Sequence, residues 1–416
     1  MKRNKHCSIY LKLFGYILAL LTPLSIHPES MYCRDIPPLY TLQPSDNLQF
    51  GRLWQQIKRL EESGVLYEMA LQRREEIHAI KEHWKAKIPS FELISLQREL
   101  DFLLETGSLQ PSDHGCGAAY FLKDEQGKPL YVIKPLDEDI LCLNNRKHFA
   151  SPYNNRAFRV RAEIPLYRTV QAEALSFAVA HLLGLENQTP PTHLAIISHE
   201  SFFDITDNLK EEEKSQYLSK MGLPQREKLC SVQTYLAETK NLYDLVEDCL
   251  NNNLTDKDIL PLIDHASFEN LCLLIWLLYD TDAHAGNLYV KKSPQGIYHL
   301  LKIDNGLTFP NANSHLLNAL YFFPHAKSPL SKRMCTIIEN LPIEEIIEKI
   351  HLYEMDDALD AFLQRVEILQ TLAKDTNYSL REIDMRLHAL ELPEGTKIAL
   401  NTELSLEELQ RLISYE

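Results

Sequence analysis

The chain has 416 residues, of which 58 are acidic and 43 basic, so its formal net charge is −15 with histidine neutral. This acidic balance argues against non-specific nucleic-acid binding, which requires a dense positive surface. Hydrophobic residues make up 45% of the chain and charged residues 24%, so most of the chain can bury a core, in two or three domains or in one two-lobed unit with an appendage.

The first thirty residues predict an export signal or a membrane anchor. Basic residues at positions 2, 3 and 5 precede a largely apolar run, Ile9–Ile26, that Lys12 interrupts. No clear small-x-small cleavage site follows, so signal and anchor remain alternatives for residues 1–30. An ordinary amphipathic or core helix is the third interpretation.

Residues 45–110 predict a helical extension in front of the main body. Apolar residues recur at near-helical spacing among charged ones from Leu53 to Leu71, and Glu92–Glu105 repeats the pattern. We expect two or three amphipathic helices here. A coiled-coil arm that binds a partner is the less favoured alternative, because the heptad phase does not persist.

The periodicity changes at Pro111, where a second region begins. Tyr120–Lys123 and Leu130–Lys134 flank the turn signal Asp124–Pro129 and predict a β-hairpin. The other elements expected before residue 237 are a helix, a strand and a short strand-like segment at Leu166–Leu183, Thr192–Ser198 and Val232–Leu236. The charged stretch 206–229 is expected to be exposed.

The remainder of the chain is predicted to be mostly helical. The expected elements are helices at Asn241–Leu250 and Ala266–Tyr279, short strands at Leu288–Lys291 and Tyr298–Ile303, and acidic helices from Leu316 onward. Early strands followed by helices and a second small hairpin indicate a two-lobed α+β body, with a ligand site in the cleft between the lobes.

A glycine-containing loop, His114–Tyr120, enters the predicted hairpin. Gly115 and Gly117 leave the backbone amides unobstructed, and such a loop can lie over phosphates. Counting outward from the turn, Lys134 falls opposite Ala119, so its ammonium is expected beside this loop. Taken alone, the loop is equally consistent with a tight strand entry, and the lysine with a solvated strand end.

Two acidic motifs follow in the mostly helical region. Asp282 and Asn287 have the Asp-x4-Asn spacing of protein-kinase catalytic loops, in which the acid accepts the hydroxyl proton and the amide oxygen binds magnesium. Asp304-Asn305-Gly306 matches the Asp-x-Gly that supplies the main metal carboxylate. Either acid alone would more often be a turn residue or a helix cap.

The glycine loop, the strand lysine and the two acidic motifs occur in the order found in kinases. This combination predicts an α+β, bilobal protein-kinase-like fold that uses ATP and Mg²⁺. Residues 111–236 would form a small β-rich N-lobe, and residues 237–416 a mostly helical C-lobe.

Five segments carry a resemblance to the phosphatidylinositol 3-/4-kinase catalytic domain family, within which they are most similar to type II phosphatidylinositol 4-kinases and their plant relatives. The segments are Gly115–Glu138, Pro190–Thr192, Asp280–Val290, Ile303–Pro310 and Pro324–Ser331. The similarity covers about residues 113–335, in family order, and leaves out the helical extension and the N-terminal segment.

The resemblance implies a role for each matching residue. Gly115 and Gly117 would lie over the phosphates of ATP, and Lys134 would bind the α and β phosphates. Asp282 would position or deprotonate the attacking hydroxyl. Two residues would bind magnesium, Asn287 and Asp304.

Two further assignments concern the ion pair of the lysine and the adenine pocket. Glu173 on the predicted helix is the candidate partner of Lys134, Glu163 competes with it, and a simple surface glutamate is the alternative. The segment from Gln233 to Leu236, with Tyr235, would be the hinge that faces adenine.

The sequence departs from the family in two places. Ala283 stands where the family has arginine, and His284 is expected either to stabilise the transferred phosphate or to brace the loop. The eight cysteines stand singly, so a zinc-thiolate site is unlikely and the family's palmitoylated cysteine cluster has no counterpart. Membrane attachment would therefore depend on the N-terminal apolar segment or on surface contacts.

The implied function is ATP- and Mg²⁺-dependent phosphorylation of a phosphoinositide head group at a membrane surface. Tyr321–Phe323 and the nearby cations Lys327, Lys332 and Arg333 support a lipid-facing surface, although these aromatics could equally pack in the core. The alternatives are a protein kinase of the same fold and an ATP-binding pseudokinase or interaction module, for which Ala283 is the motive. The protein is expected to be membrane-associated or secreted, with its kinase domain acting in an ATP-containing cytoplasm.

Overall fold

The computed structural model of the protein describes residues 65–388, except 89–90, 114, 116, 141, 143, 147–158, 162–163, 209–210, 212–213, 216–217, 220–221, 253, 255, 313–315 and 375–377. The predicted signal or anchor and the first part of the predicted helical extension lie outside these residues. Within the described part of the chain, none of the helices has the length and apolar character needed to cross a bilayer.

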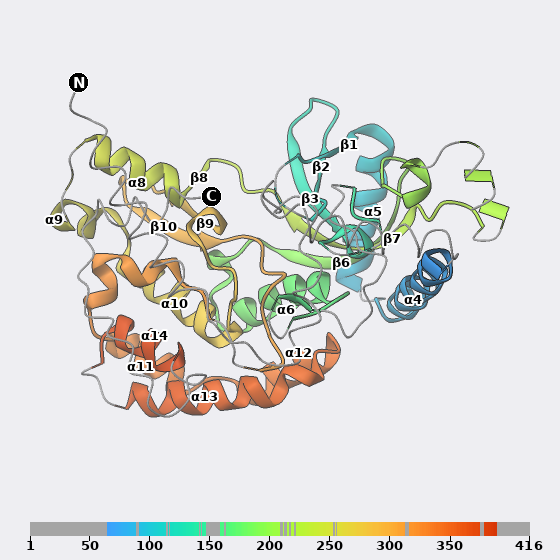
Figure 1. Ribbon diagram of the computed structural model, residues 1–416. Helices are drawn as coiled ribbons and strands as arrows, with labels where there is room; N and C mark the ends of the chain where they lie inside the picture. Colours follow the sequence, from blue (N-terminus) through green and yellow to red (C-terminus); the bar gives the residue numbers. More distant parts are fainter. Residues whose placement is uncertain are drawn as a thin grey trace, which may run out of the picture.

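The smaller lobe is built on a five-stranded antiparallel sheet with strand order β1-β2-β3-β7-β6 (Figure 1). The strands are β1 (Ser108–Pro111), β2 (Tyr120–Lys123), β3 (Pro129–Pro135), β6 (Thr192–Ser198) and β7 (Glu227–Thr234). In the β2–β3 hairpin Tyr120, the first residue of β2, pairs with Ile133. Lys134 is the next residue of β3, so it lies at the end of the hairpin where the glycine loop joins β2.

Three helices cover the two faces of this sheet. They are α4 (Val65–Lys87), α5 (Phe91–Thr106) and α6 (Thr169–Leu182). Alternate residues of β6 point to opposite faces, because side chains in a strand alternate. Leu194 packs in one apolar cluster with residues of α4 and α6, whereas Ala195 packs in another with residues of α5. The sheet therefore lies between α5 on one side and α4 with α6 on the other.

The larger lobe is mostly helical and surrounds the buried helix α10 (His265–Leu278) (Figure 1). Its other helices are α8 (Leu242–Asn251), α9 (Asp256–Ile259), α11 (Lys332–Glu339), α12 (Ile343–Leu352), α13 (Leu359–Ala373) and α14 (Leu380–His388). A three-stranded sheet of order β10-β9-β8 consists of β8 (Thr239–Asn241), β9 (Leu288–Lys292) and β10 (Tyr298–Lys302). Asn287 directly precedes β9, and Asp304 is the second residue after β10.

The described part also contains a two-stranded ribbon and several turns of 3₁₀ helix. The ribbon pairs β4 (Arg159–Arg161) with β5 (Ile164–Pro165). The 3₁₀ turns are η3 (Leu136–Glu138), η4 (Glu186–Gln188), η5 (Ile205–Asn208), η6 (Leu260–Leu262), η7 (Ala285–Asn287), η8 (Ala319–Phe322), η9 (Pro324–Lys327) and η10 (Asp356–Ala358).

The predicted α+β, two-lobed architecture is present in the described residues, with one local error. Residues 206–229 were expected to be exposed, but β7 begins at Glu227 and both Lys228 and Leu229 are buried. The error arises because β7 is a central strand, flanked by β3 and β6. The charge of Lys228 is satisfied inside the lobe by Asp137 at 3.0 Å and Glu138 at 2.8 Å.

Candidate active site

Three charged side chains from separate parts of the chain meet where the two lobes join. Lys134 leaves β3, forms an ion pair with Glu173 of α6, and lies 3.0 Å from Oδ1 of Asp304, which follows β10. Glu173 is 2% exposed, whereas the carboxylate of Asp304 is 51% exposed. The network therefore has a buried end and an end open to a ligand. Glu163, the competing candidate, lies outside the described residues.

Mutual attraction keeps this network charged. The Lys134 ammonium holds the pKa of Asp304 down to about 2, against the opposing effect of burial. Burial disfavours the charge of Lys134, but Asp304 and Glu173 together raise its pKa above the usual lysine value. Burial raises the pKa of Glu173, and the lysine counteracts it. At neutral pH Asp304 thus presents an ionised oxygen at the cleft.

The second motif follows the end of α10. The helix begins at the N-cap Asp264, whose Oδ2 accepts from the backbone N of Ser267 at 2.7 Å, and it ends at Tyr279 in the left-handed region at φ 50°. This reversal directs the chain into the loop that carries Asp282 and Asn287. Asn287 Nδ2 donates to the backbone O and to Oδ2 of Asp282, at 3.0 and 3.1 Å. The amide nitrogen thus holds the acid in place, which leaves its oxygen as the atom available for a metal.

His284 braces this loop from inside. Its Nδ1 accepts from the backbone N of Gly286 at 3.1 Å, so Nδ1 carries no proton and the proton of the neutral ring is on Nε2. That Nε2 lies 3.8 Å from Oδ2 of Asp282. Of the two roles expected for His284, bracing the loop is the one with contacts in the structure.

Sequence reasoning missed the residue that ties the two acidic motifs together. The Nζ of Lys302 donates to the backbone O of Asp304 at 2.8 Å and to Oδ1 of Asn305 at 3.2 Å, and it lies 2.6 Å from Oδ2 of Asp280. The other carboxylate oxygen of Asp280 accepts from the backbone N of Asp282 at 2.8 Å. The available signal was a lysine that ends an otherwise apolar strand directly before the Asp-x-Gly motif.

The departure at Ala283 has a structural counterpart. Ala283 is fully buried and forms a parallel bridge with Asn318, and its O accepts from the backbone N of Ala319 at 2.9 Å. The position therefore packs against the segment of the C-lobe that contains Asn318. Asn318 is held in turn by Asp384 of α14 at 2.7 Å.

The glycine loop lies close to η3 and the residue after it. Ala118 N donates to Glu138 O at 3.1 Å, and a Cβ at Gly117 would lie only 2.6 Å from Oδ1 of Asp139. That oxygen is held by the backbone N of Ile140 at 2.7 Å. Gly117 is therefore required by close approach, whereas Gly115, at φ 74°, is required by its backbone conformation.

The two predicted hinge residues differ in where they point. Gln233 is buried, and its Nε2 donates to Oε2 of Glu173 at 3.3 Å and to Oγ1 of Thr192 at 3.4 Å. Gln233 therefore contacts the charged network by its hydrogen bond to Glu173. Tyr235 is half-buried, its N donates to Leu130 O at 2.8 Å, and its ring meets Phe121 edge-on at 6.0 Å.

The donor set suits a magnesium ion bound together with nucleotide. Asp304 is an ionised, half-exposed carboxylate and Asn287 contributes an amide oxygen, and Mg²⁺ prefers such hard oxygen ligands. Magnesium usually takes one or two protein ligands and completes its shell with phosphate oxygens and water. These two residues would hold it.

Comparisons with known proteins find distant relatives by sequence. No family model matches the chain. The chain is similar to three phosphatidylinositol 4-kinase gamma proteins of Arabidopsis thaliana, gamma 6 at 26% identity over 56% of the chain, gamma 5 at 28% over 55%, and gamma 2 at 22% over 64%. The aligned parts cover 36%, 33% and 46% of those proteins, so the chain matches less than half of their length.

A structure comparison adds a solved kinase. The crystal structure of the Golgi casein kinase aligns with 71% of this chain and 78% of its own, at a TM-score of 0.39 and 13% identity. By sequence, this chain is therefore distantly similar to plant proteins named phosphatidylinositol 4-kinase gamma.

Proposed function

We propose that the protein transfers the γ-phosphoryl group of ATP to a hydroxyl of a phosphoinositide head group, with Mg²⁺ as cofactor. The observation that carries this proposal is the ion-pair network of Lys134, Glu173 and Asp304, with Asp282 and Asn287 on the neighbouring loop. The lipid class is supported by the relatives, which are named as phosphatidylinositol 4-kinases.

The residues of the chain account for the parts of such a transfer. Lys134 binds phosphate oxygens of the nucleotide, and Glu173 fixes the ammonium in the cleft. Asp282 accepts the proton of the attacking hydroxyl while the new oxygen–phosphorus bond forms and the bond to the β-phosphate oxygen breaks, releasing ADP. Magnesium supplies neutralisation of phosphate charge when it is bound.

The predicted membrane-facing aromatics are mostly used inside the protein. Phe323 is buried beside Phe268, and Tyr321 lies under the guanidinium of Arg381 at 4.9 Å. Phe322 stays half-buried, and the exposed cations Lys327 and Lys332 remain for contact with anionic head groups. Fewer aromatic side chains can thus face a lipid than the sequence suggested. The proposed contact with a membrane surface therefore depends mainly on the basic side chains. Attachment through the N-terminal apolar segment stays a prediction.

The test is radiolabelled phosphate transfer by the full chain, with Mg²⁺ present. We expect labelling of vesicles of phosphatidylcholine with phosphatidylinositol, and no labelling of phosphatidylcholine vesicles alone. Asp282→Asn and Asp304→Asn should each remove the transfer, whereas Asp360→Asn, on the exposed surface of α13, should not.

The other outcomes separate the alternatives. Labelling of protein extract without lipid labelling would replace the lipid substrate by a protein substrate. ATP binding with no transfer to either would establish a pseudokinase. If the two site variants transfer phosphate as the wild type does, the catalytic assignment is wrong.

A further inference from the structure

Helix α4 belongs to the part of the chain outside the kinase motifs, yet it packs on the helix that carries Glu173. Ile77, Ile80 and Trp84 of α4 share one apolar cluster with Val170 and Ala174 of α6. Trp84 is 4% exposed. A large buried aromatic side chain contributes strongly to such packing. Helix α4 thus packs directly against the helix that carries Glu173.

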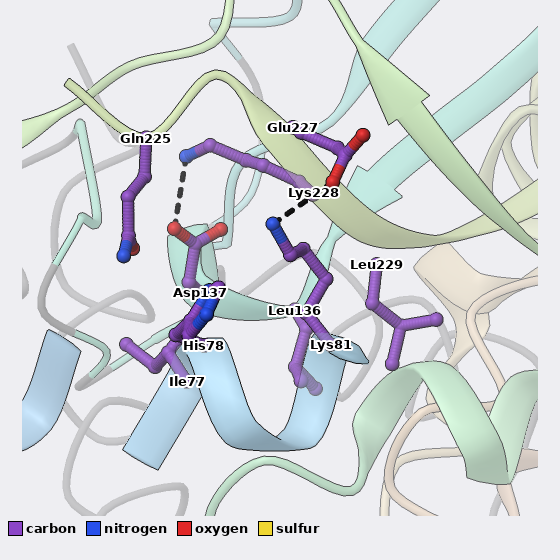
Figure 2. A pocket seen from close by; sticks show the side chains of 9 residues that line it. All are labelled: Ile77, His78, Lys81, Leu136, Asp137, Gln225, Glu227, Lys228 and Leu229. Atoms are coloured by element: carbon purple, nitrogen blue, oxygen red, sulfur yellow. Dashed lines mark hydrogen bonds and ion pairs between the residues drawn. The ribbon is translucent and has the colours of Figure 1, made fainter. Parts of the chain in front are cut away.

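The same helix is tied to the N-lobe sheet by charges. Lys81 Nζ lies 2.9 Å from Oε1 of Glu227 in β7, and Lys85 Nζ reaches the same oxygen at 2.8 Å. Figure 2 shows Lys81 and Glu227 at the rim of a small pocket, next to the buried pair of Lys228 and Asp137. The lysines hold the pKa of Glu227 below its usual value. The ion pairs of Lys81 and Lys85 with Glu227 thus attach α4 to the sheet of the small lobe.

The last turn of α4 reaches the other lobe. His83 Nε2 and Lys87 Nζ each lie 2.6 Å from Oε1 of Glu354, the second residue after α12. Beside them the rings of Trp84 and Tyr353 are 6.5 Å apart. Glu354 adopts a left-handed backbone, at φ 57°, which turns its side chain toward α4 in this arrangement. One helix therefore contacts the sheet, α6 and the C-lobe together.

We propose that α4 is a positioning element for the active site: it bridges the two lobes and holds α6 so that Glu173 meets Lys134. Trp84 and the Lys87–Glu354 pair are positioning residues, since they act through α6 and the lobe orientation and touch neither nucleotide nor substrate. The expected effect of α4 on activity rests on the proposed kinase function. The expected effect of α4 on the position of α6 does not.

A purely stabilising helix would behave differently from a positioning one. Loss of stability alone lowers the melting temperature but leaves kcat/KM unchanged in the folded fraction. Loss of positioning loosens α6 in the folded protein and weakens the step that needs Lys134 and Glu173. Hydrogen exchange of the α6 backbone amides, residues 169–182, reports on the loosening of α6 without any assay of activity.

The test uses Glu354→Lys in the full chain, with Glu348→Lys on the exposed face of α12 as the matched control. We expect Glu354→Lys to speed exchange in α6 and to lower kcat/KM for ATP about tenfold, a usual size for coupling between distant sites. The control should do neither. The double variant Lys87→Glu with Glu354→Lys recreates an ion pair and should recover most of both losses.

Variants at Trp84 provide a second test of the proposal. Trp84→Phe keeps an aromatic ring and should behave nearly as wild type, whereas Trp84→Ala should show the fast α6 exchange if it folds. Unchanged exchange of α6 in folded Glu354→Lys, or no recovery in the double variant, overturns the proposal. If the wild type transfers no phosphate, the kinase proposal fails, and the exchange data still decide the role of α4.

Discussion

The Nζ of Lys302 lies 2.6 Å from Oδ2 of Asp280, and the two side chains are only 3% and 1% exposed. Asp280 is two residues before the candidate catalytic acid, and Lys302 is two residues before the candidate metal ligand. The pair therefore links the two acidic motifs across the base of the site. Burial raises the pKa of Asp280, and the ammonium of Lys302 opposes this shift. The pair is stable as a unit because each charge compensates the other.

The first prediction concerns removal of one member of this pair. Lys302→Met leaves the carboxylate of Asp280 buried without a counter-charge and should lower the free energy of unfolding by about 3 to 5 kcal/mol. Adding Asp280→Asn should recover part of the loss, because the remaining buried group is neutral. Denaturant unfolding measures both effects. Lys291→Met, an exposed lysine of β9, is the control, and a Lys302→Met loss as small as that of the control would contradict the prediction.

The second prediction ranks two substitutions in the cleft network. Lys134→Met removes the cation that contacts both Glu173 and Asp304 and should lower kcat/KM for ATP about 100-fold or more. Glu173→Gln should cost less, because the amide oxygen still accepts from Lys134 and Asp304 still holds the ammonium at 3.0 Å. Initial-rate kinetics at varied ATP give the ranking. The reverse order would show that Glu173 does more than orient the lysine.

The third prediction concerns pH and the buried carboxyl of Glu138. Burial raises the pKa of Glu138 from 4.5 to about 7, although Lys228 favours the ionised form. Between these two values the folded chain binds more protons at this group than the unfolded chain does. Its contribution to stability is therefore greatest below pH 4.5, falls as the pH rises to about 7, and is constant above.

Comparison with Glu138→Gln isolates this effect from that of other acids. The free energy of unfolding of the wild type, relative to that of the variant, should fall between pH 4.5 and 7 by up to about 3 kcal/mol. Urea unfolding at intervals of pH gives the curve. A difference that rises over this interval would mean that the folded state stabilises the ionised form.

Much of the architecture could be read from local pattern. The β2–β3 hairpin was predictable because two apolar segments flank a turn that contains Asp124, Gly127 and Pro129, and β6 was predictable as an apolar run after two prolines. The order of the glycine loop, lysine strand and acidic motifs indicated a bilobal kinase-like fold, and the described residues do form two lobes of α+β structure. Local pattern failed at Lys228, since nothing in a charged segment shows that its strand lies in the middle of a sheet.

The sequence by itself determined which residues carry chemical groups suited to phosphate transfer, because Asp282, Asn287 and Asp304 are separated by spacings that a loop and a hairpin impose. Only the tertiary structure decided how those groups are held. The Lys302–Asp280 pair and the Lys87–Glu354 pair join residues that are distant along the chain, and no periodicity records such a contact. Folding brings them together, and packing makes their charges depend on one another.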